Sequence, residues 1–269
     1  MNEPASTPKR GVLDFLNMIY DGHHEYAVMA VKAPFEETVR SFIDCRQERP
    51  LRRRTNWKGY ANRGEDKLER ATVRWVKNIE TRSPKEGDYL TFAFPVLQVK
   101  GSQWTVILKS LFVYNQESID MTREAAILSS MRQTQVVTFA EEDTSSAMVY
   151  GIFENGNKVE KFEAWDWTSF ESQLRSEPAL FLELFELKQE DEENIWQKKS
   201  SNFDINRKYD FREQARVKFV NATFSKLGIY IPACYPVTDD GEPMLAIDPA
   251  SENTIDRAGW VEVKYTNIT

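Results

Sequence analysis

Apolar and polar residues alternate, or apolar residues gather in short runs, along much of the chain, which predicts β-strands. In residues 88–114 the two halves flank "KGSQ", which predicts a hairpin, and Pro95 within it predicts an edge strand or a bulge. Asn155-Gly156 predicts a tight turn, because both central positions of a type I′ turn need a positive φ. Asp240-Gly241 is a similar turn signal. The segments with strand patterns are 25–33, 88–114, 134–165 (a three-stranded meander), 229–249 and 259–266.

Helical patterns separate these strand segments. Pro34 predicts the first turn of a helix over 34–45, and Asp120 or Thr122 is the predicted cap of a helix over 118–133. The widest apolar face occurs over 204–228, where Gly228 occupies the position of a C-terminal cap. A short helix at 11–20 and an apolar helix beginning near 176–178 are also predicted, whereas the apolar spacing of 67–79 fits a helix and a strand equally well.

Helices and antiparallel hairpins therefore mix without a regular βαβ rhythm, which favours an α+β fold: a mostly antiparallel sheet, built from hairpins and a meander and packed against several helices. Residues 1–10 are expected to be a flexible tail, and 11–170 an α+β domain with a basic insertion at 46–77. Residues 171–269 are expected to form a helical and β-hairpin part packed on the same core.

Composition favours a folded, soluble, cytoplasmic protein. The chain has 269 residues, of which 41% are hydrophobic, enough for a core without disulfides. Its two cysteines, Cys45 and Cys234, show no metal or redox spacing, and neither a signal peptide nor a membrane-spanning apolar run is found. The Asn-x-Thr triplets at Asn221 and Asn267 are then chance matches, and no membrane partner is expected.

Charge is segregated along the chain. The net charge is −7, yet residues 46–77 hold 11 Lys and Arg against 4 acids, which leaves the rest at 24 bases against 38 acids, or −14. Arginine beside aromatic residues suits a protein interface and also a single-stranded nucleic-acid groove. The predicted partner-binding residues are Arg52, Arg53, Arg54, Trp57, Lys58, Tyr60, Arg63, Arg70, Arg74 and Trp75.

Candidate catalytic chemistry is sparse. Histidine occurs only at His23 and His24, and neighbouring strand residues point to opposite sides, which disfavours a shared metal. Two acidic clusters could bind Mg²⁺ or do acid/base work, but turn chemistry alone also accounts for them. They are Glu141, Glu142 and Asp143, and Asp239, Asp240 and Glu242. No cofactor or metal site is assigned.

Three functions remain. The leading one is a non-enzymatic binding protein with a macromolecular partner, most readily a protein, in outline similar to immunity proteins or accessory subunits of bacterial complexes. The alternatives are a nucleic-acid-binding module that uses the 46–77 segment and a metal-assisted hydrolase that uses the acidic clusters. The acidic run 190–193, predicted to follow an apolar helix, could instead neutralise the arginines within the chain.

Overall fold

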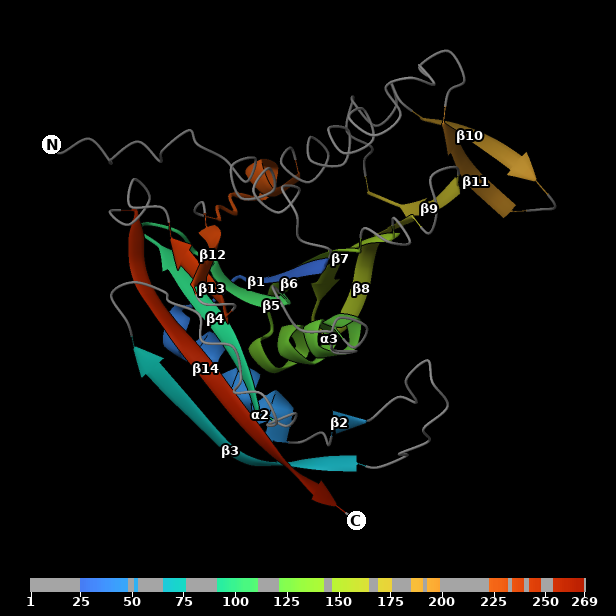
Figure 1. Ribbon diagram of the computed structural model, residues 1–269. Helices are drawn as coiled ribbons and strands as arrows, with labels where there is room; N and C mark the ends of the chain where they lie inside the picture. Colours follow the sequence, from blue (N-terminus) through green and yellow to red (C-terminus); the bar gives the residue numbers. More distant parts are fainter. Residues whose placement is uncertain are drawn as a thin grey trace, which may run out of the picture.

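The computed structural model describes thirteen stretches of the chain, which hold two helices and fourteen strands (Figure 1). The described residues are 25–47, 51–52, 65–75, 91–110, 121–142, 147–164, 169–175, 185–190, 193–198, 223–231, 234–239, 242–247 and 254–268. The helices are α2 (Phe35–Gln47) and α3 (Met121–Arg132). The strands are β1 (Glu25–Val31), β2 (Leu51–Arg52), β3 (Glu65–Trp75), β4 (Thr91–Val99), β5 (Thr105–Ser110), β6 (Gln135–Glu142), β7 (Ala147–Glu154), β8 (Asn157–Ala164), β9 (Ser169–Gln173), β10 (Phe185–Glu190), β11 (Glu193–Lys198), β12 (Cys234–Asp239), β13 (Glu242–Ile247) and β14 (Ile255–Ile268).

Twelve of these strands form one sheet, in the order β10-β11-β9-β8-β7-β6-β1-β5-β4-β14-β3-β2, and every neighbouring pair is antiparallel. β12 and β13 pair separately as a hairpin. The expected meander is β6-β7-β8, and the hairpin around "KGSQ" is β4-β5. The mixed α+β fold is therefore found, with an antiparallel sheet at its centre.

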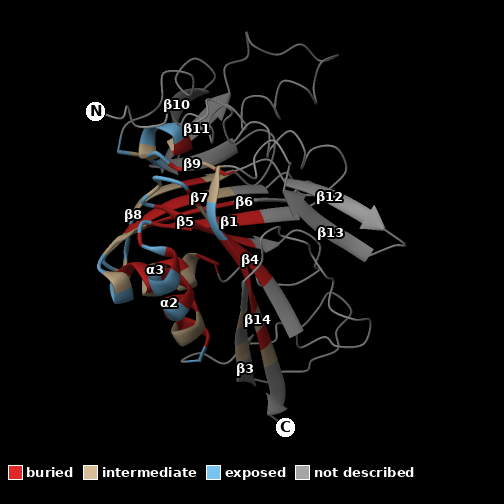
Figure 2. Ribbon diagram, turned by 90° about the vertical axis from the view of Figure 1, so that its left-hand side faces the viewer, coloured by how far each residue is buried: buried red, intermediate tan, exposed pale blue. Residues whose placement is uncertain are grey.

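The sheet has an apolar cluster on each face. On one face α3 packs over β6, β7 and β1, and α2 packs over β3, β4 and β14 (Figure 2). Phe35, Phe42, Phe94 and Leu128 are fully buried in the cluster on this face. The cluster on the other face is built around Trp104, Phe139 and Trp260, and residues 224–231 contribute to it. Because β1 lies in the middle of the sheet, its alternate residues enter both clusters and are buried throughout 27–31.

Local turn signals are confirmed. Asn155 and Gly156 both have positive φ, 51° and 87°, as the tight β7-β8 turn requires. Gly228 has φ 73° directly after a helical turn at 223–227, as a C-terminal cap should. The Pro34 carbonyl accepts the first helical hydrogen bond of α2, from the Thr38 N–H at 2.9 Å.

Several local predictions are corrected. The undecided 67–79 segment is strand over its described residues, 67–75, because β3 pairs along β14. Residues 185–190 and 193–198, expected as the end of a helix and an acidic tail, are the paired strands β10 and β11, and β11 also pairs with β9. Thr122 lies inside α3 and does not cap it, and Asp120 lies outside the described residues. The expectation of several helices is not confirmed, since the structure describes two helices and one helical turn, with 11–20, 176–184 and 204–222 outside its ranges.

Pro95 is not on an edge strand, because β4 lies between β5 and β14. The pairs that β4 makes with β5 run only from Val96 to Gln98, so Pro95 lies opposite Trp260 of β14 and beyond the β5 ladder. Proline has no backbone N–H to donate, and at this position the β4-β5 ladder requires no donor.

Candidate functional site

Two paired strands of the sheet, β2 and β3, flank the middle of the basic segment. Arg52 ends β2 and Glu65 begins β3, and the two residues are register partners. The sequence between them, "RRTNWKGYANRG" at 53–64, has four Arg and Lys residues, one Trp, one Tyr and no acid. We call residues 53–64 the basic loop. Hairpin connections usually have two to five residues, and much longer ones are commonly functional.

The predicted interface residues divide between the described strands and the basic loop. Arg70, Arg74 and Trp75 belong to β3, where they lie opposite Lys264, Trp260 and Gly259 of β14. Arg52 is at the end of β2. The other six predicted residues lie outside the described ranges: Arg53, Arg54, Trp57, Lys58, Tyr60 and Arg63.

Arg46, the first basic residue of the segment, has an internal role. Its guanidinium lies 2.6 Å from the Glu124 carboxylate of α3, and its side chain is only 5% exposed. It also stacks against Phe42 and Phe94, with 5.1 and 4.8 Å from its central carbon to the ring centroids. This buried ion pair holds the C-terminal end of α2 against α3. Six residues, 47–52, separate Arg46 from the basic loop.

The acidic run does not lie beside the arginines along the sheet. Glu190 and Glu193 are register partners at the tip of the β10-β11 hairpin. β10 and β2 are the two ends of the sheet, separated by eleven inter-strand spacings of about 4.8 Å each. Figure 1 shows β10 and β11 at the top right and β2 at the bottom. This order weighs against the hypothesis that the run neutralises the segment.

The structure describes two residues of each acidic cluster, and these four residues lie at strand ends. Glu141 and Glu142 are the last residues of β6 rather than turn residues, and Asp239 and Glu242 face each other across the β12-β13 connection, as expected for a turn. Asp143, Asp240, His23 and His24 fall outside the described ranges. Within those ranges, no three His, Cys, Asp or Glu residues are placed to share a metal ion.

A second candidate site lies where four chain connections meet. It is an open hollow of about 730 Å³ beside the β1-α2 junction. We call it the amide hollow, because five of its lining side chains are carboxamides. These are Gln98, Gln103, Gln133, Gln135 and Asn155, and the remaining lining residues are Lys32, Ala33, Pro34, Ser102, Thr134 and Glu154.

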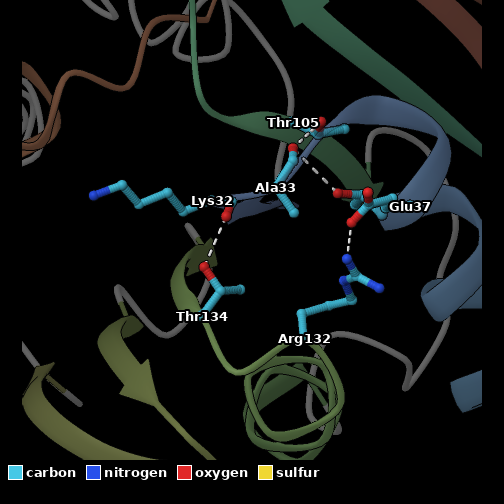
Figure 3. A network of polar contacts seen from close by, with 7 residues as sticks. Lys32, Ala33, Glu37, Thr105, Arg132 and Thr134 are labelled. Atoms are coloured by element: carbon cyan, nitrogen blue, oxygen red, sulfur yellow. Dashed lines mark hydrogen bonds and ion pairs between the residues drawn. The ribbon is translucent and has the colours of Figure 1, made fainter.

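The floor of the amide hollow is fixed by hydrogen bonds to the β1-α2 connection (Figure 3). The Lys32 carbonyl accepts from the Thr134 hydroxyl at 2.7 Å, and the Ala33 carbonyl accepts from the Thr105 hydroxyl at 2.9 Å. The Lys32 N–H donates to the Gln135 carbonyl at 3.0 Å. An ion pair between Arg132 and Glu37 joins the end of α3 to the start of α2.

Charge in the amide hollow is compensated on one side. Glu154 lies 2.8 Å from the Arg175 guanidinium and accepts a hydrogen bond from the Gln135 amide at 2.9 Å. These bonds, with Arg175 the larger cause, lower the pKa of Glu154 below its ordinary value. The ammonium of another lining residue, Lys32, lies 6.0 Å above the Trp104 ring. Glu154 is therefore ionised at neutral pH, and Arg175 compensates its charge.

Arg175 and the buried Tyr150 share a hydrogen-bond partner, Glu160. The Arg175 N–H donates to Glu160 at 3.4 Å, and the Tyr150 hydroxyl donates to the same carboxylate at 3.2 Å. Burial first, and the Glu160 charge second, raise the pKa of Tyr150 far above its ordinary value. Tyr150 therefore remains a protonated donor.

No protein-family model, curated protein or solved structure matches this chain. Among the described residues, no helix is both long and apolar enough to cross a membrane. Sequence reasoning did not find the amide hollow. The available signal was the recurrence of uncharged amides at three connections, "QVKGSQ", "RQTQ" and "ENGN", which no known motif singles out.

Proposed function

We propose that the protein is a non-enzymatic binding protein whose basic loop recognises an acidic surface on a protein partner. The observation that carries this proposal is the pairing of Arg52 with Glu65, which holds both ends of a 12-residue, acid-free connection together at one end of the sheet. Holding both ends of a loop reduces the entropy lost when it binds. Loops supported by a rigid scaffold are also where binding residues are commonly found.

The charge distribution supports a protein partner over a nucleic acid. Outside 46–77 the chain carries a formal charge of −14, which repels an extended polyanion within a Debye length of about 8 Å at physiological salt. A compact acidic patch on a protein can contact the basic loop alone. Arg, Trp and Tyr are also the residues that contribute most binding energy at protein interfaces.

Fluorescence anisotropy can separate the two partner classes. The probes are a labelled poly-glutamate peptide and labelled single- and double-stranded DNA and RNA, titrated with the protein between about 50 and 300 mM salt. The test variant is Arg52→Ala/Arg53→Ala/Arg54→Ala. The matched control, Arg40→Ala/Lys100→Ala/Arg123→Ala, removes the same charge from three exposed positions elsewhere.

We expect the peptide to bind more tightly than any oligonucleotide. The test variant should lose about a hundredfold in affinity, since interface arginines commonly contribute about 1 kcal/mol or more each. The control should bind within about twofold of the unmodified protein, because exposed charges away from the contact contribute little. Tighter binding of an oligonucleotide, with a steep salt dependence lost in the test variant, would instead identify a nucleic-acid-binding module. Absence of binding to every probe at low salt would contradict the proposal.

A further inference from the structure

The amide hollow has the size and rigidity of a small-molecule site. Its volume of about 730 Å³ lies within the range of about 300 to 1,000 Å³ for such sites. It is assembled from the β1-α2, β4-β5, α3-β6 and β7-β8 connections, each anchored in the sheet or a helix. Its shape therefore does not depend on a single free loop.

Gln98 connects the start of α2 to the β4-β5 turn at the edge of the hollow. Gln98 accepts a hydrogen bond from the Phe35 N–H at 3.3 Å and donates one to the Ser102 carbonyl at 3.1 Å. Together with the bonds of the floor (Figure 3), this joins β4, the β4-β5 turn and the start of α2. The polar groups of the hollow are thus oriented before any ligand arrives, which lowers the entropy cost of binding.

The other carboxamides keep bonding capacity. Gln133 and Gln135 donate through their nitrogens, to Ser130 and Glu154, so each retains an amide oxygen directed by that bond. The side-chain amides of Gln103 and Asn155 have no hydrogen bond within the described part of the chain. A carboxamide offers two donors and an acceptor, so the hollow presents both kinds of group in similar numbers.

The charges around the hollow disfavour an ionic ligand. Glu154 is paired with Arg175, while Glu37 and Glu36 at the start of α2 are paired with Arg132 and Arg257. A cation would therefore meet acids that already have partners. Lys32 is the single basic side chain among the lining residues, so an anion would meet one ammonium rather than a cluster of positive charge.

We propose that the amide hollow binds a neutral polyhydroxylated molecule, a sugar of one or two rings. A hydroxyl group both donates and accepts, which matches carboxamides, whereas a charged ligand would need a concentration of opposite charge that is not found here. The Lys32 ammonium supplies additional donors to sugar oxygens. The argument for this site uses no residue of the basic loop, so its test does not depend on the proposed partner.

The test uses the full chain and defined sugars. Glucose, galactose, N-acetylglucosamine, maltose, lactose and chitobiose are screened by saturation-transfer NMR and then by calorimetry up to about 10 mM, with inorganic phosphate and acetate as anionic probes. Gln103→Ala is the test variant, because its exposed side chain makes no bond that the fold needs. Gln47→Ala, at the end of α2 far from the hollow and also exposed, is the matched control. Lys32→Met reports the role of charge.

At least one sugar is expected to bind with a Kd of about 1 mM or below. Gln103→Ala should weaken that binding about three- to tenfold, the value of one neutral hydrogen bond, with an unchanged melting temperature, and Gln47→Ala should leave the Kd unchanged. Failure of all six sugars to bind would overturn the proposal, as would binding that Gln103→Ala does not weaken. Tighter binding of phosphate or acetate, abolished by Lys32→Met, would overturn the assignment of a neutral ligand.

Discussion

Replacing Arg46 with alanine removes a positive charge from the interface between α2, α3 and the sheet. In the folded protein the Arg46 guanidinium lies 2.6 Å from Glu124, with side chains only 5% and 13% exposed. Without Arg46, the Glu124 carboxylate stays in a poorly solvated position without that charge, and Phe42 and Phe94 lose a stacked cation. Breaking a buried pair from one side costs about 3 to 5 kcal/mol.

That loss should be visible in equilibrium unfolding. For proteins of about this size each kcal/mol lowers Tm by about 2 to 4 °C, so we expect Arg46→Ala to melt about 6 to 20 °C below the unmodified protein. Urea titration should show a correspondingly lower free energy of unfolding with an unchanged slope.

The double variant Arg46→Met/Glu124→Leu distinguishes loss of the Arg46–Glu124 charge pair from loss of packing volume. It removes both charges and fills the space with apolar atoms, so it should recover most of the stability lost in Arg46→Ala. A loss below about 1 kcal/mol in the single variant would refute the reasoning, because it would mean that the pair is well solvated. So would a double variant as unstable as Arg46→Ala.

Three further predictions concern turns and titrating groups. Gly156→Ala should lower the free energy of unfolding in urea by about 1 to 3 kcal/mol, and by more than Gly101→Ala does. Both glycines have positive φ, but only a Cβ at Gly156 would meet a side chain, at 3.2 Å. Equal losses in the two variants would contradict this. The raised pKa of Tyr150 means that its contribution to stability is complete below its ordinary value of 10.0 and is lost as the pH rises above it. Tyr150→Phe should therefore lose less stability than the unmodified protein between pH values of about 9 and 11, and parallel pH profiles would contradict this. The lowered pKa of Glu154 gives the opposite sign: its contribution is present above its ordinary value of 4.5 and is lost as the pH falls through the lowered pKa. Arg175→Gln should shift that pKa upward in a carboxyl ¹³C NMR titration, and an unchanged pKa would show that the pair does not form in solution.

Local chemistry made the turns predictable. Asn155-Gly156 and Gly228 need backbone conformations that few other residues tolerate, and Pro34 is suited to the start of a helix, so these features followed from the residues themselves. The β4-β5 hairpin and the β6-β7-β8 meander followed because their partners are adjacent in sequence.

Strand identity was harder where the partner is distant in sequence. The apolar spacing of residues 67–75 fits a helix and a strand equally well. They form a strand because they pair with β14, almost 200 residues later. The β10-β11 hairpin likewise joins the sheet through β9, with Trp196 opposite Phe170 and Gln197 opposite Ser169. The amide hollow could not be predicted for the same reason, because only the strand order brings residues 32, 98–103, 133–135 and 154–155 together.

The most direct test of the binding function is quantitative affinity capture from the native host, with three forms of the chain run in parallel. These are the unmodified protein, the variant with Arg52, Arg53 and Arg54 replaced by alanine, and the control with Arg40, Lys100 and Arg123 replaced by alanine. Any captured protein is then purified and titrated directly against each form. We predict an acidic protein that the unmodified and control forms bind equally and that the Arg52–Arg54 variant binds about a hundredfold more weakly. Recovery of no protein whose binding depends on these arginines would contradict the proposed function.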